Sequence, residues 1–210
     1  MALFNIIKRI YMVPGTCGYE SNVSSFANAS FGLKFEDINQ DFLAFLPIQG
    51  SKVLDAGCGV GQNAAALCEL GYKVDAVEPL AAFLDKAKVR YEGMPIVWLE
   101  DSLPDLKLLD TKEHVYDFIL LDGVWHHLSH HERKRCIRRL YELLSLNGVC
   151  AISLRNGPAG VGTHVFPTSC EELLNLARET GFKTIFQAQN QPSKMPNKQD
   201  VIWSRVALRK

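Results

Sequence analysis

The chain has 210 residues, 47% of them hydrophobic, which is enough apolar material for the core of one enzyme-sized domain. Lysine and arginine together number 23, as do aspartate and glutamate, so the chain lacks the basic excess of proteins that bind nucleic acid mainly through phosphate contacts. Six cysteines occur without a C-x-x-C pair and without a preceding secretory signal, which predicts reduced thiols and a cytoplasmic protein.

The N-terminal stretch MALFNIIKRIYMV is apolar but is interrupted by Lys8 and Arg9. A membrane-spanning helix needs roughly 20 apolar residues, so we expect no membrane crossing here. We expect this stretch to pack on its own domain or to close over a binding site, with a weak amphipathic membrane contact as the alternative.

Helices and strands are expected to alternate along the rest of the chain. The patterns predict a helix at 35–46, a strand at 52–56, a helix at 62–71, a strand at 73–78, a helix at 80–90 and a strand at 95–99. They continue with a buried strand at 115–123, a helix near 130–145 and another buried strand at 148–154. This alternation predicts an α/β fold, an open and mostly parallel sheet with helices on both faces and a ligand site at the carboxyl ends of the strands.

The last part of the chain is expected to hold one helix and two strands. A capping box over Thr168–Glu171 predicts the start of a helix that ends at Thr180, before Gly181. Strand-like runs at 182–189 and 201–208 flank a polar loop, which predicts a hairpin.

A glycine-rich loop follows the first predicted strand in the sequence VLDAGCGVG. Gly57, Gly59 and Gly61 form G-x-G-x-G, but Gln62 stands where a dinucleotide fingerprint requires glycine or alanine. The G-x-x-x-x-G-K-[ST] phosphate loop is excluded too, because GQNAAALC has no lysine or hydroxyl at the required positions. Asp55 at the mouth of the loop would repel a pyrophosphate and attract an ammonium or sulfonium, so we expect a cationic ligand.

VLDAGCGVG resembles the first motif of the class I S-adenosylmethionine-dependent methyltransferases, and the resemblance extends from about Phe35 to the C-terminus. It implies a Rossmann-like, doubly wound sheet of seven strands in the order 3-2-1-4-5-7-6, with an antiparallel final hairpin. LLSLNGVCAIS resembles the L-x-P-G-G turn of this family, with Asn147 replacing the proline. On this basis 35–210 is the methyltransferase domain, and 1–34 is an N-terminal segment that could form a lid over the site.

The resemblance also implies S-adenosylmethionine as the cofactor, with S-adenosylhomocysteine as its product. Glu78 is expected to bind the ribose hydroxyls, Asp101 is expected to meet the adenine, and Asp122 follows the fourth strand. The expected cofactor-binding residues are Asp55, Gly57, Cys58, Gly59, Glu78, Pro79, Asp101, Ser102, Leu103, Asp122 and Gly123.

VWHH and SLRNGP resemble the VW-x-H and SLR-x-GP motifs of small bacterial methyltransferases of the methyltransferase 11/12 type. The N-terminal CGYES departs from the basic-residue-Tyr-Glu pattern of that group, because Gly18 stands where an arginine would be. Tyr19 in this stretch is a candidate for contact with the methyl acceptor.

The histidines of HHLSHHERKR invite two interpretations. His126 and His127 are each four residues from a second histidine, a spacing that could bind a metal on one helical face. Ser129 and Glu132 form a capping box, however, so the helix should begin at His130 and we expect no metal site. His126 or His127 is then a candidate general base, with hydrogen bonds that shape the pocket as the alternative.

Trp125 and Arg155 flank the same region. An aromatic wall and a guanidinium would suit a planar or anionic acceptor, while core packing for Trp125 and a surface salt bridge for Arg155 are equally compatible with the sequence.

The sequence thus predicts a methyltransferase that acts on the oxygen or nitrogen of a small molecule, as a monomer or homodimer that binds neither nucleic acid nor membrane. Two alternatives stay open. One is a macromolecular acceptor such as tRNA or a protein side chain, and the other is a non-catalytic subunit that binds S-adenosylmethionine.

Overall fold

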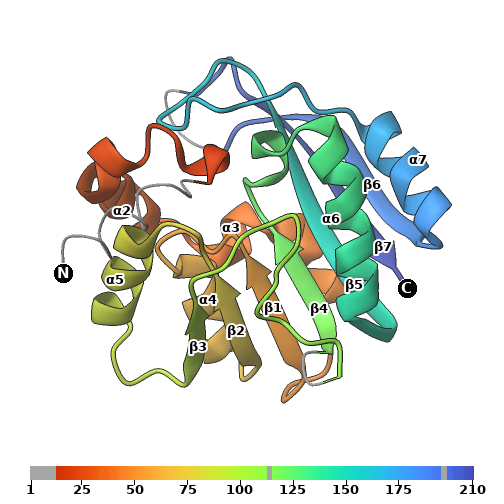
Figure 1. Cartoon of the computed structure of the whole chain (residues 1–210), viewed down its shortest axis with the longest axis horizontal. Helices are drawn as coiled ribbons and strands as arrows, with labels where there is room; N and C mark the ends of the chain where they lie inside the picture. Colours follow the sequence, from red (N-terminus) through yellow and green to blue (C-terminus); the bar gives the residue numbers. More distant parts are fainter. Residues whose placement is uncertain (1–12, 113–114, 195–197) are drawn as a thin grey trace, which may run out of the picture.

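The computed structural model describes residues 13–112, 115–194 and 198–210 and contains one seven-stranded sheet (Figure 1). The strands are β1 (Lys52–Ala56), β2 (Lys73–Val77), β3 (Ile96–Leu99), β4 (Tyr116–Leu121), β5 (Leu144–Asn156), β6 (Lys183–Pro192) and β7 (Ile202–Arg209). The α-helices are α2 (Val23–Phe31), α3 (Phe35–Ile38), α4 (Gln62–Glu69), α5 (Ala81–Arg90), α6 (His130–Leu143) and α7 (Cys170–Thr180). Short 3-10 helices are η1 (Pro14–Thr16), η2 (Glu20–Asn22), η3 (Gln40–Phe45) and η4 (Trp125–His127).

The strands lie in the order β3-β2-β1-β4-β5-β7-β6, as predicted. The first five are parallel, and β7 runs antiparallel to both of its neighbours. The carboxyl ends of β1 to β5 therefore meet at one edge of the sheet, and the amino end of β7 lies at that same edge because its direction is reversed.

Helices cover both faces of the sheet, and the central strands alternate between two hydrophobic layers. In β4, Ile119 and Leu121 pack in one layer together with residues of α6 and α7, while Phe118 and Leu120 pack in the other layer with α4. A strand buried on both faces needs apolar residues at every position, which explains the continuous apolar run there. Figure 1 shows α6 across the near face of β4 and β5.

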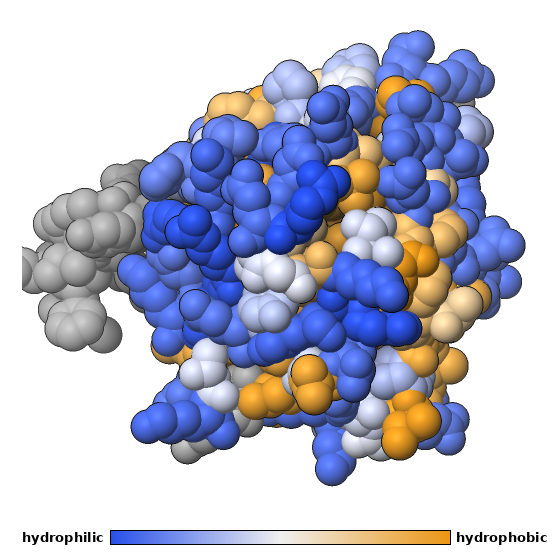
Figure 2. All heavy atoms as spheres, turned by 90° about the vertical axis from the view of Figure 1, so that its right-hand side faces the viewer, coloured by the Kyte–Doolittle hydropathy of each residue, from blue (hydrophilic) through white to orange (hydrophobic). Residues whose placement is uncertain are grey.

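The outer face over α7 and the β6 edge, seen in Figure 2, is mainly hydrophilic with smaller hydrophobic areas between. This agrees with the exposed side chains of β6, the last strand of the sheet.

Three details differ from the sequence predictions. The first is the helix predicted at 35–46, which is divided into α3 and η3 at Asn39. Asn39 has the non-helical angles φ −106° and ψ 22°, and its buried side chain donates a hydrogen bond to Asn63 Oδ1 at 3.3 Å. The helix is therefore interrupted at the residue whose side chain forms a hydrogen bond with α4.

The second difference is the start of α7, which lies one residue later than the predicted capping box. Ser169, not Thr168, accepts the hydrogen bond of the Glu172 N–H, at 3.3 Å. Thr168 instead donates its N–H to Asn156 Oδ1 at 2.8 Å and so ties the loop after β5 to the end of that strand.

The third difference concerns Asn147, which does not take the place of a proline. Its φ is +66°, in the left-handed region, whereas the proline ring fixes φ near −65°. Asn147 therefore has the conformation that a glycine of the L-x-P-G-G turn would adopt, and asparagine tolerates it better than most residues do.

The described part of the N-terminal segment lies above the carboxyl edge of the sheet, where Figure 1 shows it crossing from α2 toward the middle of the molecule. Phe26 of α2 stacks on Phe83 of α5 with ring centroids 4.7 Å apart. Most of the apolar stretch MALFNIIKRIYMV lies outside the described residues. No helix in the described ranges is long and apolar enough to cross a membrane.

Candidate functional site

The glycine loop after β1 keeps its backbone amides for internal hydrogen bonds. The N–H groups of Gly57 and Cys58 donate to Val77 O at 2.8 and 2.9 Å, and that of Gly61 donates to Cys58 O at 2.9 Å. The N–H of Gly59 donates to Glu78 Oε2 at 3.0 Å. An anion cannot bind to amides that are already paired, so these four N–H groups are not available to a phosphate.

Two of the glycines are required by close packing. Gly57 has φ +83°, and a Cβ there would lie 2.5 Å from Val124 Cγ2. Gly61 has φ +84°, and a Cβ there would lie 2.5 Å from Cη2 of Trp98 in β3. The third glycine therefore serves the contact with β3, a role that the G-x-G-x-G spacing alone does not indicate.

Glu78, directly after β2, is 6% exposed and is held by two backbone donors. Its Oε2 accepts from Gly59 and its Oε1 accepts from the Leu80 N–H at 2.9 Å, so each oxygen keeps a further lone pair. Burial raises the pKa of Glu78 to about 7. Burial, followed by the nearby charge of Asp122, raises the pKa of Asp55 to about 8, and Asp55 Oδ2 is buried with no hydrogen-bond partner.

A cavity of about 140 Å³ lies beside the loop, and we call it the glycine-loop cavity. The predicted residues on its wall are Gly57, Cys58, Gly59, Glu78, Pro79, Asp101, Ser102, Leu103, Asp122 and Gly123. Asp55 is not on this wall, because it is buried behind the loop. The wall also contains residues that were not predicted from the sequence: Pro14 and Thr16 of the N-terminal segment, Gln62 and Phe83.

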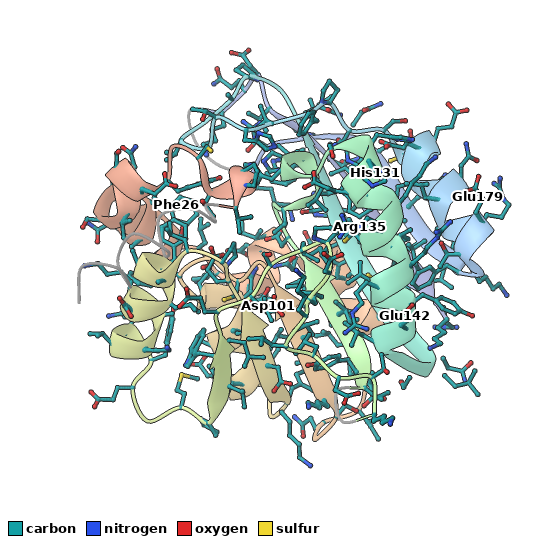
Figure 3. All side chains as sticks on the ribbon, in the orientation of Figure 1. Phe26, Asp101, His131, Arg135, Glu142 and Glu179 are labelled. Atoms are coloured by element: carbon teal, nitrogen blue, oxygen red, sulfur yellow. The ribbon has the colours of Figure 1, made fainter. Side chains whose placement is uncertain are left out.

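Asp101 and Asp122 on this wall are both held by hydrogen bonds. Asp101 accepts the N–H groups of Ser102 and Leu108, each at 2.7 Å, and thereby shapes the loop after β3. Asp122 accepts from the Ser153 hydroxyl at 2.7 Å and from Asn63 Nδ2 at 3.3 Å. In Figure 3, Asp101 lies near the middle of the molecule, and Phe26 lies on α2 at the side of the same cavity.

The charges around the glycine-loop cavity have one sign. Glu78, Asp101, Asp122 and Glu132 line it, and no lysine or arginine among the described residues does so. The cavity therefore favours a cationic ligand, as Asp55 predicted.

A second cavity, of about 380 Å³, adjoins the first and is lined by several basic side chains, so we call it the basic cavity. Tyr19, Phe26, Gln62, Asp122 and Gly123 line both cavities. Arg155 lies on the wall of the basic cavity. The same wall contains Lys198, Trp203 and Arg205, which were not predicted from the sequence.

The two neighbouring histidines face different cavities. His127 lines the glycine-loop cavity, and its Nδ1 lies 2.8 Å from His164 O, so Nδ1 carries the proton and Nε2 is the acceptor. The hydroxyl of Tyr19 donates to that Nε2 at 3.1 Å. Both nitrogens of His127 are thus engaged within the protein.

His126 lines the basic cavity and is 5% exposed. Its Nδ1 is buried without a hydrogen-bond partner, and no hydrogen bond is made by its Nε2 to any described residue. Burial lowers the pKa of His126 to about 2, so the ring is neutral at physiological pH. Of the two histidines, His126 is therefore the one whose ring nitrogens have no partner among the described residues.

The sequence was compatible with two positions for Trp125, the wall of the acceptor site and the hydrophobic core. The structure places it in the core. Its side chain is fully buried in the layer that contains α6, and it lines neither cavity. The aromatic wall of the basic cavity comes instead from Trp203, Phe26 and Tyr19.

The helix α6 begins at His130, with the complete Ser129–Glu132 capping box that the sequence predicted. His126 and His127 consequently lie in η4, outside the helix that carries His130 and His131. His130 Nδ1 contacts Glu172 Oε1 at 2.6 Å. Within the described ranges, no three His, Cys, Asp or Glu side chains form a group that could bind a metal ion.

Comparison with known proteins agrees with this geometry. Residues 53–148 match a family described as a methyltransferase domain. An uncharacterized methyltransferase of Mycobacterium tuberculosis is 31% identical over 120 residues, so the match spans 54% of this chain and 58% of the relative. An uncharacterized methyltransferase of Oceanobacillus iheyensis is 26% identical over 169 residues, and this match covers 80% of this chain and 72% of the relative.

The fold also matches a solved structure, that of 1,6-didemethyltoxoflavin-N1-methyltransferase from Burkholderia thailandensis. The TM-score is 0.68 at 19% identity, with 92% of this chain and 84% of that chain covered. Residues 53–148 thus resemble a methyltransferase domain in sequence, and the chain has the fold of a solved methyltransferase.

The glycine-loop cavity fits S-adenosylmethionine, the methyl donor that many methyltransferases use, in its chemistry. S-adenosylmethionine carries a sulfonium and an ammonium, which suit the four carboxylates on the wall. Its ribose diol can donate to the lone pairs that Glu78 retains beside the bonds from Gly59 and Leu80. The N–H groups of Gly57, Cys58, Gly59 and Gly61 are already paired and are not free to bind the pyrophosphate of a dinucleotide.

Proposed function

We propose that the chain is a methyltransferase that transfers the methyl group of S-adenosylmethionine to an oxygen or nitrogen of a small molecule. The observation that carries the proposal is the acidic glycine-loop cavity, which shares a wall with a second, basic cavity. The second cavity is about 380 Å³, within the range of roughly 300–1,000 Å³ for small-molecule sites. A tRNA or protein acceptor would need a broader contact surface, so a cavity of this volume favours a small acceptor.

The protein's own contribution would be to hold the reactants and to remove a proton. S-adenosylmethionine supplies a methyl group that is already activated on a sulfonium. Glu78 would bind the ribose hydroxyls, and Tyr19 and Phe26 on the common wall would exclude water from the junction of the cavities. His126 Nε2 would accept the proton that an acceptor hydroxyl or amine loses.

We further propose that residues 1–34 act as a lid. In support, Val13 to Thr16 and Tyr19 line the glycine-loop cavity, whose volume of about 140 Å³ is below the usual range for a ligand of nucleoside size. Such a ligand could be admitted only if part of the wall moves, and Val13 to Thr16 contribute to the wall from outside both the sheet and the helices α4 to α7.

The proposed cofactor site is tested by thermal unfolding with S-adenosylhomocysteine. At about a hundred times its dissociation constant the ligand should stabilise the fold by roughly 2.7 kcal/mol, a rise in Tm of roughly 5–10 °C, and NAD should cause none. Glu78→Ala should abolish most of the shift because it removes the ribose acceptor. Glu69→Ala, at an exposed position of α4, is the matched control and should keep the shift.

A rise in Tm with NAD and none with S-adenosylhomocysteine would overturn the assignment, as would a Glu78→Ala variant that binds like the parent. The non-catalytic alternative predicts the same binding, and it is separated from the enzyme by whether methyl transfer to any acceptor occurs.

A further inference from the structure

The basic cavity has an excess of positive charge. Arg155, Lys194, Lys198 and Arg205 line it, and Asp122 is the one carboxylate on its wall among the described residues. Asp122 is already bonded to Ser153 and Asn63. The wall therefore leaves cationic charge that its own carboxylate does not balance.

Two of these cations have identified acceptors elsewhere in the protein. Lys194 Nζ donates to the backbone oxygen of Asp37 and to Gln40 Oε1. Arg205, 4% exposed, donates to Ile38 O at 3.0 Å, and its Nε lies 3.7 Å from Asp41 Oδ2, too far for a hydrogen bond. The Nε of Arg205 is buried without a hydrogen-bond partner.

Arg155 is a half-buried cation with little internal compensation for its charge. It extends from the carboxyl end of β5, is half-buried, and donates to one backbone oxygen, that of Pro158, at 2.6 Å. No carboxylate of the described residues forms an ion pair with Arg155 or with Lys198. A guanidinium held in a cavity without a carboxylate partner is a natural site for a ligand's anionic group.

The remaining wall is apolar and aromatic. Trp203 lies opposite Arg155 in the β5–β7 pairing, and Phe26, Leu33, Ile38 and Val165 complete this side of the cavity. A ligand that fills the cavity therefore needs an apolar body as well as a negative charge, since burying a purely polar molecule against these side chains would be unfavourable.

We infer that the methyl acceptor is a small organic acid with an apolar, aromatic body, whose carboxylate is bound by Arg155 and Lys198 in the basic cavity. This inference rests on the proposed function, because it treats the basic cavity as the acceptor site. The opposite charges of the adjoining cavities would then match a cationic donor on one side and an anionic acceptor on the other.

The experiment compares matched acids and amides on the full chain saturated with S-adenosylhomocysteine. The probes are benzoate with benzamide, 4-hydroxybenzoate with 4-hydroxybenzamide, and indole-3-acetate with indole-3-acetamide, and binding is measured by ligand-observed NMR titration at up to millimolar concentration. At least one acid should bind at least tenfold more tightly than its amide. Arg155→Gln should weaken that acid by roughly 10- to 100-fold, the range expected for a charge-assisted hydrogen bond.

Lys198→Gln is the second variant, because an exposed lysine can be changed without risk to the fold, and it should weaken the acid by severalfold. Arg178→Gln on α7 and Lys183→Gln on β6 carry the same changes at exposed positions outside the basic cavity and should leave acid binding unchanged.

The inference is overturned if no acid binds, if acids and amides bind equally, or if Arg155→Gln and Lys198→Gln both bind the acid like the parent. S-adenosylhomocysteine binding is measured in the same samples. Normal binding of S-adenosylhomocysteine with any of these outcomes rejects the acidic acceptor alone, whereas absence of that binding rejects the proposed function.

Discussion

His126 and His127 are adjacent in the chain, yet they line different cavities and have different bonding partners. The sequence could not separate them, because the loop before α6 has no periodicity that fixes where a side chain points. The short η4 turn directs one ring to each side, and the Tyr19 hydroxyl then occupies Nε2 of His127.

His126→Ala should reduce kcat while leaving the affinity for S-adenosylhomocysteine unchanged. A general base contributes about 10²–10⁴-fold, and the low pKa of about 2 makes His126 a weak base, so we expect the lower end of that range. The measurements are single-turnover methyl transfer and calorimetric titration with S-adenosylhomocysteine. His131→Ala, at an exposed position of α6, is the control, and a His126→Ala variant with the parental kcat would exclude the base.

At this scale the sequence predicted the cofactor side of the site better than the acceptor side. Glu78, Asp101 and Asp122 follow parallel strands, and the carboxyl ends of such strands converge on one edge. Trp203 and Arg205 were missed because they lie at the amino end of β7, which reaches the same edge only because that strand is antiparallel. The prediction of an antiparallel final hairpin was the sequence signal that could have placed Trp203 and Arg205 at this edge.

At the scale of elements, the N-terminal segment is attached to the loop between β5 and α7. The Thr163 N–H donates to Cys17 O at 2.9 Å, and a Cβ on Gly18, which has φ +93°, would overlap the carbonyl oxygen of Val161. An arginine at position 18, as in the related motif, would not fit this contact. The local departure from the motif thus has a packing reason that only the folded contact reveals.

Gly162 and Gly160 in this loop form a matched pair for a test of that attachment. A Cβ on Gly162 would lie 2.5 Å from Cε2 of Tyr19 and 2.8 Å from Cε1 of His127, whereas a Cβ on Gly160 would meet nothing within 4 Å. Gly162→Ala should therefore lower the free energy of unfolding by about 1–3 kcal/mol, and Gly160→Ala should change it by less than about 0.5 kcal/mol. Urea denaturation measures both, and equal effects would contradict the close contact.

The order and direction of the strands were predicted for the whole sheet, because alternating apolar runs and turn residues marked every strand, and the resemblance implied their order. The break at Asn39 was not predictable from local pattern, since it accompanies a hydrogen bond to Asn63 on another helix. Long-range polar contacts of this kind have no signature within one segment of sequence.

At the scale of the whole molecule, a formal net charge of zero conceals two charged cavities of opposite sign. Composition shows equal numbers of acidic and basic residues, but it could not reveal this internal separation of charge, which arises only when distant segments meet. The acidic side also carries the two carboxyl groups with raised pKa values, about 8 for Asp55 and about 7 for Glu78.

These two groups predict that the stability of the empty protein falls as the pH rises, and that the affinity for S-adenosylmethionine increases. In the unfolded chain the two carboxyl groups have ordinary pKa values of 3.8 and 4.5. Between about pH 4 and pH 8 the empty folded protein therefore binds more protons than the unfolded chain does. The contribution of these two groups to stability is present below about pH 4 and is lost as the pH rises through 7 to 8. Affinity for S-adenosylmethionine should instead increase from about pH 6 to about pH 8.5, because ionised carboxylates attract its cationic groups.

Calorimetric titrations across this range measure the affinity, and thermal unfolding of the empty protein measures the stability. Glu78→Gln resembles the protonated residue at every pH, so its affinity should be lower and should depend less on pH. An affinity for S-adenosylmethionine that is constant between pH 6 and 8.5 would contradict the raised pKa values.

Tyr19, Phe26, Gln62, Asp122 and Gly123 form a wall common to both cavities, and this has a thermodynamic consequence. A ligand in either cavity contacts side chains that the other ligand also contacts, so their binding free energies are coupled. Coupling between two sites is reciprocal: the factor by which one ligand changes the affinity of the second equals the factor in the opposite direction. An acceptor titrated into the empty protein should therefore give a different dissociation constant from one titrated into the donor-bound protein. The ratio of the two constants gives the coupling free energy between the two sites.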